Sequence, residues 1–111
     1  MAAPAGTDAS GKIPVVIAVP KETAAGEQRV ATVPEVVQKL VKAGHAVRIE
    51  HDAGTAAYYP DALYTAAGAT IAAGRHELFY NANIVLFVQP PTVDDIQQLP
   101  EGTIAIGFMN P

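Results

Sequence analysis

Apolar positions along the chain follow two different periods, which predict alternating strands and helices. Runs rich in β-branched residues predict strands at 15–19, 46–50, 69–72, 84–88 and 103–108. Between them, helical spacing of apolar residues and helix-boundary signals predict helices at 34–43, 61–67, 75–81 and 92–96. Residues at the ends of the predicted helices fit this pattern: Pro34 suits a first helical turn, Gly44 suits a helix end, and Thr92 suits an N-cap.

Strict alternation of strands and helices is typical of a parallel sheet with helices on both faces. Residues 15–19 are apolar throughout, which indicates a strand covered on both sides, whereas 46–50 alternates and indicates a strand near an edge. Right-handed crossovers make such a sheet doubly wound. We therefore predict an α/β fold: a flavodoxin-like, three-layer α/β/α domain whose parallel five-stranded sheet has strand order 2-1-3-4-5.

Composition narrows the class of protein without naming a function. The chain has 111 residues, half of them hydrophobic and 16% charged, which suits one small folded domain. We interpret residues 1–14 as a flexible leader and 15–111 as the domain. The absence of Cys excludes disulfides and thiol chemistry. A net charge of −4 argues against nucleic-acid binding, and no apolar run is long enough for direct membrane insertion.

Polar residues with useful chemistry follow the predicted strands 15–19, 84–88 and 103–108. In chain order they are Lys21, Glu22, Glu27, Arg29, Gln89 and Asn110. Ligands bind beyond the carboxyl ends of parallel strands where strand order reverses, so these side chains are candidates for one site. Arg29 can donate two parallel hydrogen bonds to a carboxylate or phosphate. Gln89 and Asn110 can orient a ligand, but an amide is neither acid nor base near neutral pH.

The alternative interpretation of the charged loop 21–32 is a solvated segment with internal ion pairs, each worth only ~0–1 kcal/mol. No G-x-G-x-x-G or P-loop motif occurs in the chain. Gly44, Gly54, Gly68, Gly74 and Gly102 fall at element ends, where their φ freedom accounts for them. The three histidines, His45, His51 and His76, share no metal-ligand spacing, so we interpret them as surface or capping residues and predict no metal site.

A specific ordered set of motifs runs from residue 17 to the C-terminus. It comprises Val19-Pro20-Lys21-Glu22, Gly26-Glu27, Arg29-Val30-Ala31, Pro34, Gly44-His45, Ala53-Gly54, Ala66-Ala67-Gly68-Ala69 and Ala82-Asn83-Ile84-Val85-Leu86. In this order the motifs resemble the N-terminal segment of the alanine dehydrogenase and proton-translocating NAD(P) transhydrogenase (alpha subunit) family. The resemblance implies that the chain is the N-terminal fragment of a larger two-domain unit, whose Rossmann NAD-binding domain is absent from this sequence.

Departures from the family pattern separate its members. In its alanine dehydrogenases, an Arg in the opening motif binds the substrate carboxylate, and Arg29 matches it. A Lys after the fourth strand and a His after the fifth handle the pyruvate and its proton, and Gln89 and Asn110 occupy those positions here. A transhydrogenase needs neither group, because hydride passes from NADH to NADP⁺ without an organic acid. The pattern therefore resembles the transhydrogenase alpha subunit more.

The resemblance also implies cofactors and partners. NAD is bound mainly by the missing domain and NADP by a partner subunit or domain, and no catalytic residue is expected in this chain. We expect Arg29, Gln89 and Lys21 to contribute to cofactor binding. The implied assembly is a homodimer that docks on the membrane and NADP-binding subunits, in the cytoplasm and peripheral to the inner membrane. The alternatives are a fragment of an NAD-dependent alanine dehydrogenase, or a non-catalytic flavodoxin-like dimerisation or interaction module. The isolated chain is expected to be inactive.

Overall fold

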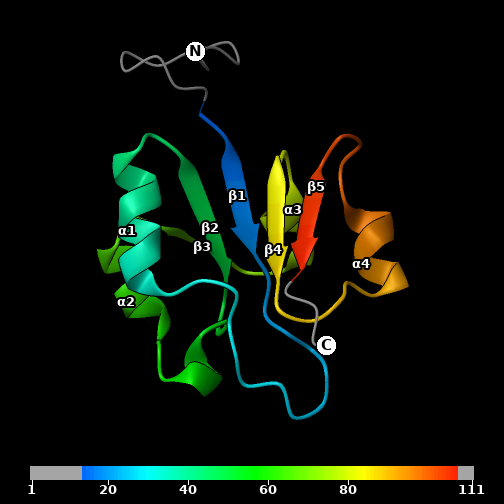
Figure 1. Ribbon diagram of the computed structural model, residues 1–111, viewed down its shortest axis with the longest axis horizontal. Helices are drawn as coiled ribbons and strands as arrows, with labels where there is room; N and C mark the ends of the chain where they lie inside the picture. Colours follow the sequence, from blue (N-terminus) through cyan, green and yellow to red (C-terminus); the bar gives the residue numbers. More distant parts are fainter. Residues whose placement is uncertain (1–13, 108–111) are drawn as a thin grey trace.

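A computed structural model of the chain describes residues 14–107, so nearly all of the predicted leader lies outside the described residues. Five parallel strands form one sheet, as predicted: β1 (Val16–Val19), β2 (Ala46–Glu50), β3 (Thr70–Ala72), β4 (Ile84–Phe87) and β5 (Ile104–Gly107). The α-helices lie between them, as Figure 1 shows: α1 (Pro34–Lys42), α2 (Asp61–Ala66), α3 (Arg75–Phe79) and α4 (Val93–Gln98). A short 3₁₀ helix at Thr55–Ala57 was not predicted.

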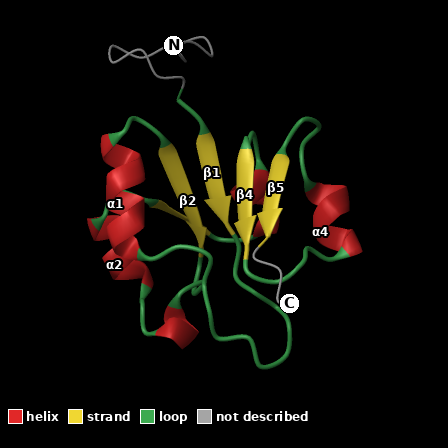
Figure 2. Cartoon of the chain, viewed as in Figure 1, coloured by secondary structure: helices red, strands yellow, loops and turns green. Residues whose placement is uncertain are grey.

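Helices cover both faces of the sheet, which confirms the three-layer α/β/α architecture (Figure 2). Alternate residues of β1 point to opposite layers. Ile17 and Val19 belong to the core beneath α1 and α2, while Ala18 belongs to the core beneath α3. All three are at most 5% exposed, as the uniformly apolar run 15–19 predicts for a central strand. The outer strand β5 is different, because Ile104 is 59% exposed and Ile106 is 43% exposed.

The order of the strands differs from the prediction. The sheet runs β3-β2-β1-β4-β5, so the predicted order 2-1-3-4-5, which places β3 beside β1, is wrong. The order 2-1-3-4-5 would need α1 and α2 on opposite faces of the sheet, but they pack side by side on the same face. Two successive right-handed crossovers on one face both lead outward from β1, which places β3 outside β2. Helix α3 lies on the other face, and the chain returns through it to place β4 against the free side of β1.

The local boundaries agree with the sequence signals. Pro34 occupies the first turn of α1, and Gly44 follows its end with a φ of 99°. Thr92 caps α4: its side chain accepts a hydrogen bond from the Asp95 amide at 3.1 Å, and the Asp95 side chain accepts one from the Thr92 amide. Helix α3 ends at Phe79, two residues earlier than predicted. No helix among the described residues has the length and apolar character needed to cross a bilayer.

Two glycines are required for different reasons. Gly68 has a φ of +102°, and a Cβ there would also lie 2.9 Å from a methyl group of Val41 in α1. Gly54 has a φ of −100°, so φ freedom does not explain it. A Cβ at Gly54 would lie 2.7 Å from the Tyr59 carbonyl oxygen and from the ring of Tyr64, so the position requires space. The expectation that φ freedom accounts for this glycine is therefore wrong.

Tyr64 is the largest fully buried side chain of the α1–α2 layer. Its hydroxyl donates a hydrogen bond of 2.8 Å to the Thr32 carbonyl oxygen, which ties α2 to the segment before α1. Burial raises the pKa of Tyr64 to about 12. The ring therefore stays neutral at physiological pH and satisfies the hydrogen-bonding requirement of a buried carbonyl group.

The substitution Gly68→Ala tests how closely α2 and α1 are packed. We expect it to lower the free energy of unfolding by about 2–4 kcal/mol, because it adds an unfavourable positive φ and overpacking against Val41. Gly102→Ala is the matched control, because Gly102 also has a positive φ of +84° but has no atom within 4 Å of the added Cβ. Denaturant titration should give a loss of about 1 kcal/mol for the control. Equal losses in the two variants would contradict the packing argument.

Candidate functional site

The carboxyl ends of β1 and β4 are neighbours, and the strand order reverses between them. From β1 the chain proceeds to β2 and β3 on one side, whereas β4 and β5 lie on the other. In an open parallel sheet this point is where a crevice for ligands forms. The segments that follow β1 and β4 contain Lys21, Arg29 and Gln89, the three residues predicted to bind cofactor. The corrected strand order thus places the loop after β4 directly beside the loop after β1.

Glu22 joins these two loops. Its two carboxylate oxygens accept hydrogen bonds from the backbone amides of Val88 at 2.9 Å and Gln89 at 3.0 Å. The amides belong to the first two residues after the end of β4. A carboxylate bound by two backbone N–H groups is held more firmly than a neutral acceptor would be. Glu22 therefore fixes where the chain leaves β4.

Glu27 brings Arg29 and Gln89 together. One of its oxygens accepts from the Arg29 backbone N–H at 2.8 Å and from Arg29 Nε at 2.9 Å. The other accepts from Arg29 Nη2 at 2.8 Å and from Gln89 Nε2 at 2.7 Å. The Glu27 side chain is 6% exposed, whereas that of Arg29 is 56% exposed. The hydrogen bonds from Arg29, and next from Gln89, hold the pKa of Glu27 well below its usual range.

The two interpretations of the charged loop each account for part of this arrangement. The ion pair between Glu27 and Arg29 lies within the loop, as the solvated-loop alternative expects. The carboxylates of Glu22 and Glu27, however, both bind the segment that follows β4, which the solvated-loop alternative does not expect. Arg29 is thus held in one orientation by two hydrogen bonds to Glu27, and its side chain is 56% exposed.

A second network, centred on Arg75, lies beneath the loop. Arg75 Nη1 donates to Asp95 at 2.7 Å, Nη2 donates to the Lys21 carbonyl oxygen at 2.6 Å, and Nε is 3.1 Å from Glu50. The same Glu50 oxygen accepts from the Lys21 backbone N–H at 2.7 Å. All three charged side chains are at most 17% exposed. Arg75 therefore connects β2, α3, α4 and the segment after β1.

Sequence reasoning did not identify Arg75, Glu50 or Asp95 as parts of the site. Asp95 carried one signal, since it lies three residues after the predicted N-cap Thr92. That signal indicates a helix start, but it does not indicate that Asp95 pairs with Arg75, twenty residues earlier in the chain. Glu50 ends an alternating strand, a pattern that favoured exposure.

Lys21 and Arg29 contribute to an open pocket of about 220 Å³ between the loop after β1 and the turn after β2. Ala53, Thr55 and Ala56 form the opposite wall. Gln89 does not line this pocket and is connected to it only through Glu27. Asn110, the last of the six candidate residues, lies outside the described residues.

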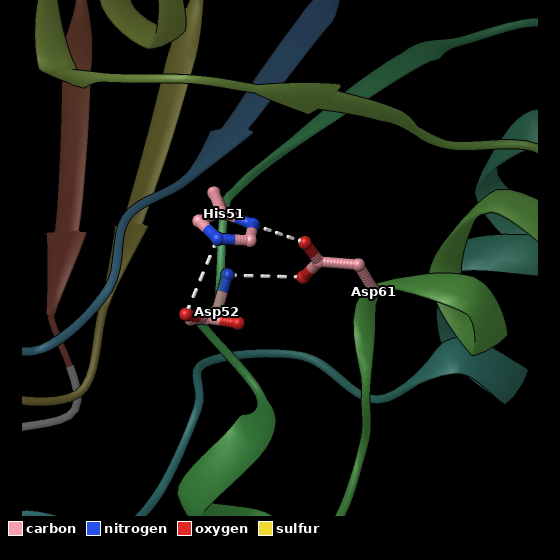
Figure 3. A group of neighbouring side chains, drawn as sticks. All are labelled: His51, Asp52 and Asp61. Atoms are coloured by element: carbon pink, nitrogen blue, oxygen red, sulfur yellow. Dashed lines mark hydrogen bonds and ion pairs between the residues drawn. The ribbon is translucent and has the colours of Figure 1, made fainter.

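His51, Asp52 and Asp61 form a polar cluster at the end of β2 (Figure 3). His51 Nδ1 is 2.6 Å from an Asp61 oxygen, and His51 Nε2 is 3.3 Å from an Asp52 oxygen. The three side chains could hold a metal ion, but both ring nitrogens already face carboxylates, an arrangement that suits a protonated imidazole. The hydrogen bond to Asp61, with the charge of Asp52, raises the pKa of His51 above its ordinary value. His51 is thus a surface residue, as predicted, with partners that the sequence did not indicate.

Comparisons with known proteins agree with the motifs. Residues 18–111 match the family described as alanine dehydrogenase/PNT, N-terminal domain. The chain belongs to this family. The alpha subunit of NAD(P) transhydrogenase from Haemophilus influenzae is 37% identical over 95 residues, which are 86% of this chain and 18% of that protein. An alpha-subunit chain of the NAD(P) transhydrogenase from Rhodospirillum rubrum is 43% identical over 93 residues, 79% of this chain and 24% of that protein.

Alanine dehydrogenases of the family are similar to the same extent. That of Staphylococcus saprophyticus is 35% identical over 96 residues, 86% of this chain and 26% of that protein. Among solved structures, a transhydrogenase from Sinorhizobium meliloti has a TM-score of 0.78 at 30% identity, covering 83% of this chain and 27% of that one. An L-alanine dehydrogenase has a TM-score of 0.76 at 29% identity, covering 85% and 26%. The chain thus spans about a quarter or less of these family members.

The His51 cluster gives this family member a pH-dependent contact. The contact of protonated His51 with Asp61 and Asp52 stabilises the folded state. Because the folded-state pKa of His51 is raised, this stabilisation is complete below the unfolded-state pKa of about 6.5 and is lost as the pH rises through the folded-state pKa. We therefore expect NMR titration of the His51 ring to show a pKa above about 6.5, and Asp61→Asn to lower it. Asp94→Asn removes a distant exposed carboxylate and serves as the control. A His51 pKa that Asp61→Asn leaves unchanged would contradict the assignment.

Proposed function

We propose that the chain is the N-terminal part of the NAD(H)-handling alpha subunit of a proton-translocating NAD(P) transhydrogenase. The observation that carries the proposal is the chemistry of position 89. In this chain an amide side chain, Gln89, lies at the switch point and is bound by Glu27. An amide cannot exchange a proton with a keto acid near neutral pH, but transfer of hydride between two nicotinamides requires no such proton.

The described residues suit the edge of a nucleotide-binding site better than they suit a complete nucleotide-binding site. A pyrophosphate is usually bound by backbone N–H groups at a glycine-rich turn and a helix N-terminus. Here three backbone N–H groups that follow β1 and β4 are occupied, since Lys21 donates to Glu50 while Val88 and Gln89 donate to Glu22. We infer that the phosphates of NAD are bound by the part of the subunit beyond this chain. Arg29, Gln89 and Lys21 would then face the cofactor across a cleft between domains.

The proposal includes partners. The complete subunit would form a homodimer and dock on the membrane and NADP-binding subunits, on the cytoplasmic side of the inner membrane. NADP would be bound by the partner subunit or domain. When bound, the two nicotinamide cofactors supply the hydride donor and acceptor, and the residues of this chain orient one of them and exclude water.

An alanine dehydrogenase is the second candidate, and the geometry of Arg29 favours it. Glu27 holds the guanidinium of Arg29 from one side, and the side chain is 56% exposed beside an open pocket. A planar donor held in this way suits a substrate carboxylate. The experiment that separates the two candidates uses the complete protein: NADH-dependent reduction of NADP⁺ supports the transhydrogenase, and alanine-dependent reduction of NAD⁺ supports the dehydrogenase.

The 111-residue chain alone should bind NADH weakly or not at all, because three of its backbone donors at the switch point, those of Lys21, Val88 and Gln89, are already occupied. Isothermal titration calorimetry should detect no binding in the low micromolar range. A dissociation constant of about 1–10 μM would require a phosphate site within this chain, and would contradict the inference that the phosphates of NAD are bound by the rest of the subunit.

In the complete subunit, Arg29→Ala should weaken NAD(H) binding or closure of the two domains. The expected loss is about tenfold in affinity, as for removal of one charge-assisted hydrogen bond. Fluorescence titration of NADH measures it, and Lys39→Ala, an exposed cation on α1, is the control. Wild-type affinity, turnover and thermal stability in Arg29→Ala would show that the loop is only a solvated surface.

A further inference from the structure

Gln89 follows β4 at the switch point and is joined through Glu27 to the open pocket, and its amide has two chemically opposite ends. The nitrogen can only donate hydrogen bonds and the oxygen can only accept them. Which end faces the ligand therefore decides which ligand group is recognised. The backbone of Gln89 is itself fixed, because Glu22 binds its N–H at 3.0 Å.

Glu27 determines the orientation of the Gln89 amide. The Glu27 carboxylate receives four N–H donors, three from Arg29 and one from Gln89, and its side chain is 6% exposed. An ionised carboxylate can only accept, so it must face the amide nitrogen rather than the amide oxygen. The oxygen Oε1 is turned away from Glu27. Within residues 14–107, Oε1 accepts no hydrogen bond from the protein.

We propose that Glu27 is a positioning residue that presents Gln89 Oε1 as a fixed hydrogen-bond acceptor at the switch point, and that this acceptor selects a carboxamide over a carboxylate. The inference rests on the proposed function, in which the ligand end that approaches this chain is a nicotinamide. The carboxamide NH₂ group donates to Oε1. A carboxylate has no proton to donate and would place its negative oxygens against an acceptor, close to Glu27 and Glu22.

The selection follows from the pairing of two residue types. A lysine at position 89 would pair with Glu27 by charge and would present only donors, which suits a keto acid. The amide instead exposes its acceptor, because Glu27 occupies its donor. Glu27 and Gln89 thus act as one unit, and changing either should abolish the preference. The low pKa of Glu27 keeps the carboxylate ionised, and so keeps this orientation, across the physiological pH range.

The test uses the full 111-residue chain, labelled with ¹⁵N, and two small probes that differ only at the relevant group. Nicotinamide and nicotinate are titrated separately while the side-chain amide signals of Gln89 are followed by NMR. We expect nicotinamide to shift these signals with an affinity at least about tenfold higher than that of nicotinate. Glu27→Gln and Gln89→Met should each bring this ratio close to one. Gln89→Met keeps the length of the side chain and removes the acceptor, and its ratio is read from backbone signals.

Asp94→Asn is the matched control, because Asp94 accepts a hydrogen bond from Gln98 at 2.9 Å in the same type of pair. It removes the same charge as Glu27→Gln, and it should leave the ratio unchanged. The proposal is overturned if nicotinate binds as tightly as nicotinamide, if nicotinamide causes no shift up to its solubility limit, or if Glu27→Gln retains the preference. Failure of the proposed function is distinguishable: a complete protein without NADH-dependent reduction of NADP⁺ can still show the preference for nicotinamide.

Discussion

The guanidinium of Arg75 organises the end of the molecule where the candidate site lies. It is nearly buried, and its nitrogens contact Glu50 at the end of β2, Asp95 in α4 and the carbonyl oxygen of Lys21 after β1. A charge in this position is stabilising only when every partner is present, because an uncompensated buried charge costs several kcal/mol. The two carboxylates and the carbonyl group meet that requirement together. The elements that they belong to are thereby fixed relative to one another.

A chain of hydrogen bonds, which starts at the consecutive residues Lys21 and Glu22, connects this network to the candidate site. Lys21 is held by its carbonyl oxygen to Arg75 and by its N–H to Glu50. The next residue, Glu22, binds the backbone after β4, where Gln89 begins. Gln89 then donates to Glu27, which in turn holds Arg29. The three residues predicted to bind cofactor are therefore positioned by hydrogen bonds within and between loops, on a sheet whose parallel strands bring those loops to one edge. A site built in this way is ordered before ligand arrives, which lowers the entropy cost of binding.

The sequence predicted local structure correctly where a residue type, or a run of one type, has a single structural consequence. Apolar runs identified all five strands, and Pro34 and Thr92 located helix starts. The order of the strands was not predictable in the same way, because it depends on which face each helix covers, and an amphipathic helix such as α1 suits either face. Gly54 illustrates a second limit: its role is set by the space beside Tyr64, which no local pattern records. Hydrogen bonds between residues far apart in sequence, such as Arg75 and Lys21, could not be predicted either, because no local pattern records them.

The Arg75 network thus orders the loops that carry Gln89 and Arg29. Amide hydrogen exchange in Arg75→Met, with Arg48→Met as the control, tests it most directly. Arg48 is also an arginine bound to carbonyl oxygens, but those belong to the end of α3, at residues 77–80. We expect the Lys21, Val88 and Gln89 amides to lose about 10–100-fold of their protection in Arg75→Met while the strands stay protected, and we expect Arg48→Met to spare these amides. Unchanged protection of the three amides in Arg75→Met would contradict it.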